Sequence, residues 1–247
     1  ALVLPLAAGG LAGLAVVTAD GVHPLAAGAV AGFVLFVTTS RRMLLETTRA
    51  VLGHSETDLA AARADLRALA GRDASSLSAG EIRSAAVESA AENLADGLVA
   101  PLLYFAAIAP FSLSLATGAA AWVKAVNTID SMLGYPGEST GHAGARLDDL
   151  VMWVPSRVAA ALIAVAAIDP GALLAGRRWS PRPASPNSGV PMATIAAVLD
   201  VRLEKPGGYL LNPEVALPSP ERARRGADLV GSASAVAFVV AGVVAWL

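Results

Sequence analysis

Three carboxylates recur at helical spacing in the first half of the chain, at Glu88, Glu92 and Asp96. Steps of four residues, at 100° per residue, place them within an arc of about 80° on one helix face. Like charges at this spacing repel one another, so the stripe needs either solvating water or a bound cation. The run SAAVESAAENLADGLVAPL carries the stripe directly into an apolar segment, where an unpaired charge is costly. A solvated face and a cation site both stay open, and the position favours the cation.

Two further polar clusters border apolar segments in the same way. Their members are Lys124, Asn127, Asp130 and Ser131 in one, and Arg146, Asp148 and Asp149 in the other. Taken singly, Asn127 is typical of a cap or turn, and Arg146 with Asp149 of an i, i+3 ion pair. Together the three clusters hold six carboxylates, the hard oxygen ligands that Mg²⁺ prefers, usually one or two at a time beside phosphate oxygens.

The composition indicates where these residues lie. The chain has 247 residues, of which 55% are hydrophobic and 15% charged, against about 25% charged in an ordinary soluble domain. The absence of cysteine excludes disulfides, thiolate metal sites and cysteine nucleophiles. A net charge of −2 argues against a nucleic-acid partner. The composition therefore predicts an integral membrane protein.

The apolar segments predict an all-α fold, a multi-pass integral membrane helical bundle with amphipathic and re-entrant helices. We expect one membrane-embedded domain over residues 1–247. Its parts are a helical hairpin over 1–39, cytoplasmic and interfacial helices over 40–97, a membrane core with the polar clusters over 98–168, a loop region over 169–228, and a C-terminal membrane helix over 229–247.

Local signals predict several boundaries inside this plan. The break between the first two helices falls at residues 20–24, and Ser78 with Glu81 matches a capping box that starts a helix near Ala79. Residues 55–72 form an amphipathic helix whose apolar positions recur at steps of three and four. Those positions are Leu59, Ala62, Leu66 and Leu69.

The apolar run from Leu98 to Val123 predicts a re-entrant hairpin. A straight helix of about 26 residues would measure about 39 Å, longer than the roughly 30 Å hydrocarbon core. It would also separate the polar clusters at its two ends. Pro110 lies near its middle and favours a break, so we expect the two arms to meet there. Arg157, inside the later apolar run, is expected to line a shared cavity.

Arginines directly after the second apolar helix indicate the orientation. Arg41, Arg42 and Arg49 mark a cytoplasmic end. We therefore expect a cell-membrane protein whose active site faces the cytoplasm. The common nucleotide-binding patterns GxxxxGK[ST] and GxGxxG are absent, so any ATP site must be of another kind.

Four ordered blocks carry a family resemblance. They are VESAAENLADGLVAPLLYF (87–105), KAVNTIDSMLGY (124–135), ARLDDLVMWVPSR (145–157) and SPNSG (185–189). In order and spacing they resemble the CobD/CbiB family of cobalamin biosynthesis, the membrane adenosylcobinamide-phosphate synthases. The likeness extends over about residues 40–210.

The resemblance implies a carbon–nitrogen (acid–amine) ligase. Its reaction would be ATP-dependent amide formation joining adenosylcobyric acid to aminopropanol or aminopropanol phosphate. ATP and Mg²⁺ are the implied cofactors, and the corrinoid substrate carries its own cobalt. The implied partners are the corrinoid and amino-alcohol substrates, the lipid bilayer and other membrane enzymes of late cobalamin assembly, with no nucleic acid.

Residue by residue, the matching positions give the expected site. The expected catalytic residues are Glu88, Glu92, Asp96, Asp130 and Arg146. The expected cofactor-binding residues are Lys124, Asn93, Asn127, Ser131 and Asn187. The expected metal ligands are Glu88, Glu92, Asp96, Asp148 and Asp149. Ser185 and Pro186 also match the fourth block.

Departures from the family pattern fall mainly in the last third. Pro183 and Met192 replace a family histidine and an acid, and His142 replaces a tryptophan before the third block. The family's GGP…Y stretch survives only loosely at 205–209. The N-terminal GDP…HP region is absent, so we expect the chain to lack the family's N-terminal segment.

Two other functions stay open at this stage. In a membrane transporter or corrinoid-handling protein without ligase activity, the same carboxylates and Arg157 would form an ion or substrate pathway. Many transporters have paired halves, and the sequence shows no internal repeat. The other alternative is a non-catalytic membrane partner of corrinoid enzymes.

Overall fold

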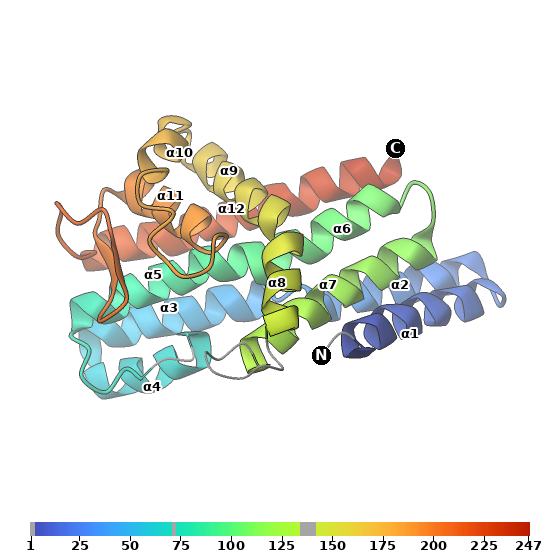
Figure 1. Cartoon of the computed structure of the whole chain (residues 1–247), viewed down its shortest axis with the longest axis horizontal. Coiled ribbons are helices and arrows are strands. Elements are labelled where there is room, and N and C mark those ends of the chain that lie inside the picture. Colours follow the sequence, from blue (N-terminus) through green and yellow to red (C-terminus); the bar gives the residue numbers. More distant parts are fainter. Residues whose placement is uncertain (1–2, 71–72, 134–141) are drawn as a thin grey trace. The chain divides into compact units, whose positions relative to one another are not determined.

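The computed structural model describes residues 3–70, 73–133 and 142–247 and is almost entirely α-helical in these ranges (Figure 1). The chain divides into two compact units. Unit 1 comprises residues 1–40, 96–155 and 237–247, and unit 2 comprises residues 41–95 and 156–236. The predicted all-α class is confirmed, with one short strand pair added in unit 2.

Unit 1 is built around the long helix α7. Its elements are α1 (Val3–Asp20), α2 (Pro24–Thr38), α6 (Ala100–Ile108), α7 (Leu113–Leu133), α8 (His142–Val151) and the end of α12 (Pro220–Trp246). Helix α7 packs against α1, α2, α6 and α8. The first two helices form the predicted hairpin (Figure 1). His23 caps α2, since its Nδ1 accepts a hydrogen bond from the Leu25 amide at 3.1 Å.

Glycines allow α1 and α7 to approach backbone to backbone. A Cβ added to Gly9 would lie 2.9 Å from the Gly118 carbonyl oxygen, and one added to Gly118 would lie 2.8 Å from that of Gly9. Gly13, one turn along α1, meets the Ser114 carbonyl in the same way at 3.1 Å. Small residues four apart are the usual means of close helix packing in membranes.

The break predicted at Pro110 is confirmed, because α6 ends at Ile108 and α7 begins at Leu113 and packs back on it (Figure 1). The expected start of the first arm at residue 98 is wrong. Helix α5 (Ala79–Leu94) continues through a π-helical turn (Ala95–Val99) into α6, giving one 30-residue helix, Ala79–Ile108. The sequence has no stop signal before Pro101, and a π-turn accommodates the missing proline N–H.

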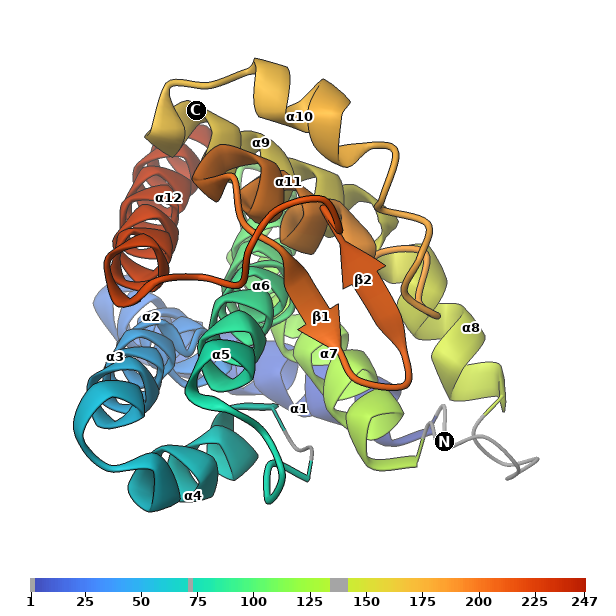
Figure 2. The same ribbon diagram turned by 90° about the vertical axis from the view of Figure 1, so that its left-hand side faces the viewer.

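Unit 2 surrounds helix α5. Its other elements are α3 (Arg41–Thr57), α4 (Leu59–Ala70), most of α9 (Trp153–Ala167), α10 (Gly171–Gly176), α11 (Gly189–Leu199), β1 (Leu203–Lys205), β2 (Tyr209–Leu211) and most of α12. Helix α5 contacts α3, α4, α11 and β1. Figure 2 shows the antiparallel β1–β2 hairpin beside α5 and α11.

Several local predictions for unit 2 are confirmed. Ser78 caps α5, with its amide donating to Glu81 Oε2 at 2.7 Å and its hydroxyl accepting from the Glu81 amide at 3.3 Å. Helix α4 buries Ala62 and Leu66 as its periodicity predicts. It begins at Leu59, because residues 55–57 still belong to α3.

The loop region expected over 169–228 is partly wrong. It contains α10, α11 and the β-hairpin, and α12 begins at Pro220 instead of residue 229. The Ser219–Pro220–Glu221 sequence supplies the start, since the Ser219 hydroxyl accepts from the Arg222 amide at 3.3 Å and proline suits the first helical position. The apolar run 150–168 is also broken, because α8 and α9 meet at a bend.

The apolar helices confirm a membrane protein. Four are long and apolar enough to cross a bilayer, or five if the α8–α9 pair, bent by 44°, counts as one. The four are Val3–Asp20, Pro24–Thr57, Ala79–Ile108 and Pro220–Trp246. Unit 1 exposes large apolar side chains such as Leu11, Phe33 and Phe36, as a lipid-facing surface does.

Candidate functional site

Glu88 is the most deeply buried residue of the predicted acidic stripe. Its relative exposure is 0%, because Ser84–Ala91 is buried throughout on α5. Its Oε2 accepts a hydrogen bond from the Tyr209 hydroxyl at 3.2 Å. The same hydroxyl lies 3.6 Å from the Met192 sulfur. A solvated face is therefore the wrong description of Glu88, and a strand of the β-hairpin supplies its donor.

Glu92, the other member of the stripe in unit 2, is half-buried, and so is the next residue, Asn93. The Asn93 side-chain amide donates to the Ser89 carbonyl at 2.9 Å, one turn earlier on α5. This bond fixes the Asn93 rotamer along the helix.

The fourth sequence block is fixed by Arg157. One guanidinium nitrogen donates to the Asn187 Oδ1 at 3.0 Å and to the Ser156 hydroxyl at 3.1 Å. Asn187 is buried, and its backbone N–H donates to the Ser185 hydroxyl at 3.3 Å. A Cβ added to Gly189 would lie 2.0 Å from the Ser180 carbonyl oxygen, so only glycine fits there. The block is thus a rigid turn that presents a buried amide.

In unit 1, Lys124 lies near Asp96. Helix α7 carries the lysine and is not among the candidate spans. Burial lowers the pKa of the Lys124 ammonium, and the negative charge of Asp96 acts in the opposite direction. The first and second sequence blocks therefore meet within unit 1.

The second and third blocks meet along α7 and α8. The Asn127 side-chain amide donates to Asp148 Oδ1 at 3.5 Å. Burial and the charge of Asp149 both raise the pKa of Asp130. Asp130 Oδ1 is buried and has no hydrogen-bond donor among the described residues. Unit 1 thus places two carboxylates within each other's electrostatic field and leaves a buried oxygen of one without a donor.

Two predicted residues of unit 1 have simpler surroundings. The Ser131 hydroxyl donates to the Asn127 carbonyl at 2.9 Å on its own helix, and Arg146 is exposed on α8. Residues 134–135 of the second block and the side chain of His142 lie outside the described residues.

The Asp130–Asp149 pair has the chemistry of a Mg²⁺ site. A buried carboxylate oxygen without a donor and a second carboxylate beside it are hard oxygen ligands. Across the described ranges, no three His, Cys, Asp or Glu side chains gather closely enough to hold a metal ion by themselves. Mg²⁺ commonly binds through one or two carboxylates plus waters and phosphate oxygens, so the pair fits a metal that arrives with a phosphate. The wider predicted ligand set stays a prediction.

Sequence reasoning missed the partner of Glu88. Tyr209 stands in the stretch where the family pattern is only loosely kept, 121 residues after Glu88. Periodicity within one helix cannot reveal a contact across that distance. The available signal was the aromatic residue directly after the Gly207–Gly208 pair, which is typical of a hairpin strand.

Comparison with known proteins gives a family match. The family model described as CobD/Cbib protein matches residues 1–236. A probable cobalamin biosynthesis protein CobD of Methanothrix thermoacetophila is 35% identical over 216 residues, which cover 85% of this chain and 68% of that protein. The cobalamin biosynthesis protein CobD of Geobacter metallireducens is 40% identical over 88% of this chain and 70% of its own length.

A third relative extends the comparison. The cobalamin biosynthesis protein CobD of Klebsiella pneumoniae is 36% identical over 77% of this chain and 60% of its own length. The chain therefore spans roughly 60 to 70% of the length of these relatives. No solved structure matches the chain.

Proposed function

The chain belongs to the CobD/CbiB family, and from this premise we propose that it is an ATP-dependent acid–amine ligase of cobalamin biosynthesis. The amide bond would join a side-chain carboxylate of adenosylcobyric acid to aminopropanol or aminopropanol phosphate. The observation that best supports this chemistry is the Asp130–Asp149 pair, whose buried oxygen is suited to a metal that accompanies phosphate.

The reaction needs an activated carboxylate, because oxide is a poor leaving group. A carboxylate oxygen of the corrinoid attacks the γ-phosphorus of ATP, ADP leaves, and an acyl phosphate forms. The amine then attacks the acyl carbon, and phosphate leaves with the former carboxylate oxygen. The amine loses one proton to a base. Each step separates or joins anionic groups, so the site must offset negative charge.

The chain's own residues divide this work. Asp130 and Asp149 would hold Mg²⁺, which when bound offsets the charge of the triphosphate and the attacking carboxylate. Lys124 and Arg146 are the cations of unit 1 available to phosphate oxygens. In unit 2, Arg157 holds the Asn187 amide in one orientation, as recognition of a carbonyl or amine requires.

We also propose that the site faces the cytoplasm of the cell membrane, where ATP is available. Support comes from Arg41 and Arg42 at the end of the α2 apolar segment. Single cysteines are introduced at Val22, two residues before the 34-residue span Pro24–Thr57, and at Thr57, its last residue. We expect an impermeant thiol reagent added to intact cells to modify Val22→Cys at once and Thr57→Cys only after permeabilisation. The reverse pattern would contradict this orientation.

Product analysis tests the reaction itself. The purified protein in detergent is incubated with adenosylcobyric acid, Mg²⁺-ATP and either aminopropanol or its phosphate, and the corrinoids are separated by chromatography. We expect one amide product and one ADP per corrinoid consumed. Unchanged corrinoid, with or without ATP hydrolysis, would contradict the ligase. Corrinoid uptake into sealed vesicles without conversion would support the transporter alternative, which no described feature favours.

A further inference from the structure

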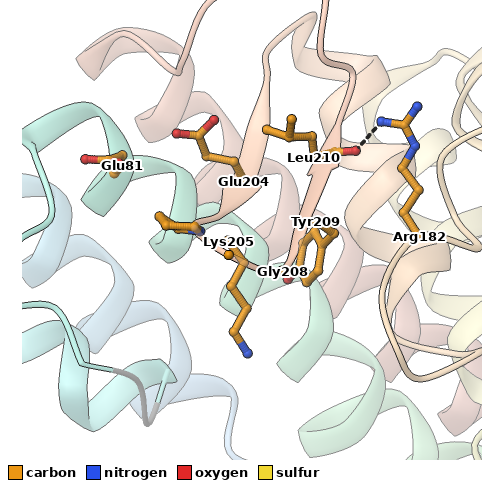
Figure 3. A pocket seen from close by; sticks show the side chains of 9 residues that line it. Glu81, Arg182, Glu204, Lys205, Gly208, Tyr209 and Leu210 are labelled. Atoms are coloured by element: carbon orange, nitrogen blue, oxygen red, sulfur yellow. Dashed lines mark hydrogen bonds between the residues drawn. The ribbon is translucent and has the colours of Figure 1, made fainter.

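A pocket of about 610 Å³ opens on unit 2 beside the β-hairpin (Figure 3). None of its lining residues belongs to the four sequence blocks described above. Its walls come from the first turn of α5, the β1–β2 hairpin and the segment before α11. The charged side chains that line it are Glu81, Arg182, Glu204 and Lys205.

Both carboxylates of the pocket are already engaged. Glu81 Oε2 accepts hydrogen bonds from the amide and hydroxyl of Ser78, at 2.7 and 2.6 Å. Glu204 pairs with Arg202 at 3.0 Å. These contacts leave the pocket's acids with local partners inside the protein.

The cations of the pocket are less fully engaged. One guanidinium nitrogen of Arg182 donates to the Leu210 carbonyl at 2.6 Å (Figure 3). Lys205 is exposed, and among the described residues its ammonium has no acidic partner. In Figure 3 its side chain extends away from both Glu204 and Arg182. With Arg202 included, there are three cations and two carboxylates, so the net charge of these side chains is positive. Neither Lys205 nor Arg182 has a carboxylate partner within the described ranges, and Arg182 is held by the Leu210 carbonyl.

The hairpin turn exposes bare backbone next to that lysine. Gly208 donates to the Lys205 carbonyl at 2.8 Å, and Gly207 has φ +72°, as in a type II turn with Pro206 at its second position. A Cβ at Gly207 would have no neighbour within 4 Å. A ligand can therefore reach the backbone at Gly207 without meeting a side chain, whereas a Cβ added to Gly208 would lie 3.3 Å from the Lys205 Cγ.

The register connects this lysine to the buried acid of α5. Lys205 is paired directly with Tyr209 across the hairpin, so the two side chains lie on one face. The Tyr209 hydroxyl reaches Glu88 at 3.2 Å. A group bound at Lys205 thus lies on the hairpin face that contacts the acidic stripe.

We propose that this pocket binds the phosphoryl group of a substrate, with the Lys205 ammonium as its counter-charge and the Gly207–Gly208 turn as its open wall. The inference rests on the proposed function, which supplies two phosphoryl sources: the ATP triphosphate and the phosphate of a phosphorylated amino alcohol. Both share the anionic chemistry that a lysine beside an exposed turn recognises.

Equilibrium binding tests the pocket independently of turnover. The purified protein in detergent is titrated calorimetrically with Mg²⁺-bound non-hydrolysable ATP, with aminopropanol phosphate and with aminopropanol. Lys205→Met removes the charge and keeps most of the length of the side chain, and Lys205→Arg restores the charge. Arg225→Met is the matched control, an exposed cation of unit 2 outside the pocket.

We expect Lys205→Met to weaken one of the two phosphate ligands about tenfold, Lys205→Arg to recover most of the loss, and Arg225→Met to have less than a twofold effect. The weakened ligand identifies the source of the phosphoryl group. Loss of binding in Lys205→Met would support the pocket even if the wild type forms no amide, so the pocket and the ligase fail separately. Equal affinities in Lys205→Met and wild type, no binding of either phosphate ligand, or equal losses in Lys205→Met and Arg225→Met would overturn the proposal.

Discussion

In unit 2, the Glu88 carboxylate lies in the centre of the fold and takes a hydrogen bond from Tyr209, and the Asn187 amide is held by Arg157. In unit 1, Asp130 has a like-charged neighbour, Asp149, and its buried Oδ1 has no donor among the described residues. The buried Glu88 Oε1 has no donor there either, so the two acids differ in the tyrosine donor on Glu88 Oε2 and in the negative charge next to Asp130. The first arrangement fixes polar groups by protein contacts. The second raises the cost of a negative charge without supplying a donor.

This difference assigns different roles to acids that look alike in the sequence. A carboxylate that already has a protein donor, such as Glu88, is suited to positioning. A carboxylate that lacks one and has a like-charged neighbour is suited to a cation that arrives with the substrate. Unit 1 is therefore where we place the charge-neutralising chemistry, and unit 2 is where we place recognition.

Asp130→Asn gives the largest expected effect. The substitution keeps the side-chain shape and removes the charge, so we expect amide formation to fall at least about a hundredfold, or about 2.7 kcal/mol of transition-state stabilisation. Thr128→Ala, an exposed hydroxyl two residues earlier on α7, is the control and should retain activity. Turnover assays at saturating Mg²⁺-ATP measure both. Near-normal activity in Asp130→Asn would place the metal elsewhere.

The same substitution should stabilise the fold. Because the pKa of Asp130 is raised above its ordinary value of 3.8, the charged form costs the folded chain more than the unfolded chain. That cost is fully present above the raised pKa and disappears as the pH falls below 3.8. With EDTA present, Asp130→Asn should melt at a higher temperature than wild type at pH 7, and the gap should close near pH 3. A lower melting temperature at pH 7 would mean that the protein already satisfies this carboxylate.

Helix packing provides the next largest contrast. Gly118→Ala forces a Cβ to 2.8 Å from the Gly9 carbonyl in unit 1, and overpacking of this kind costs about 1–3 kcal/mol. Gly28→Ala, on α2 with nothing within 4 Å, should instead stabilise by about 0.5–1 kcal/mol because it removes a helical glycine. Thermal unfolding in detergent measures both. Similar shifts in the two variants would refute the close contact between α1 and α7.

One tyrosine-to-phenylalanine variant in each unit compares how much a single hydrogen bond contributes to the free energy of unfolding. Tyr209→Phe removes the donor to the Glu88 carboxylate, and Tyr104→Phe removes a donor to the neutral Val151 carbonyl at 3.0 Å. A bond to a charged group contributes about 1.5–3 kcal/mol and a neutral one about 1 kcal/mol. We expect Tyr209→Phe to lower the free energy of unfolding more than Tyr104→Phe. The opposite order would indicate that Glu88 is neutral or satisfied by other donors.

Local features of the fold could be predicted because each depends on neighbouring residues. The Ser78–Glu81 capping box, the break at Pro110 and the buried positions Ala62 and Leu66 all follow from spacing within one segment. The early start of α12 at Pro220 was also signalled locally, by Ser219 and Glu221, but the hydropathy of the span hid it. Apolar length therefore gave the wrong boundary where capping residues gave the right one.

The site could be predicted only as residue types. Spacing brought Glu88, Glu92 and Asp96 to one helix face, but could not show that Glu88 is buried, because burial depends on the elements packed on α5. The contacts of Tyr209 and Arg157 join residues far apart in the chain. Such contacts depend on tertiary packing, and the periodicity of one helix carries no information about which distant residues pack against it.

The most direct test of ATP-driven amide formation follows the oxygen of the reacting carboxylate. Adenosylcobyric acid labelled with oxygen-18 in that carboxylate is converted in a single turnover with Mg²⁺-ATP and the amine, and the released phosphate is analysed by mass spectrometry. We expect one labelled oxygen in the phosphate for each amide formed, because the acyl C–O bond breaks with phosphate as the leaving group. Unlabelled phosphate, label in AMP, or amide formed without ATP would contradict it.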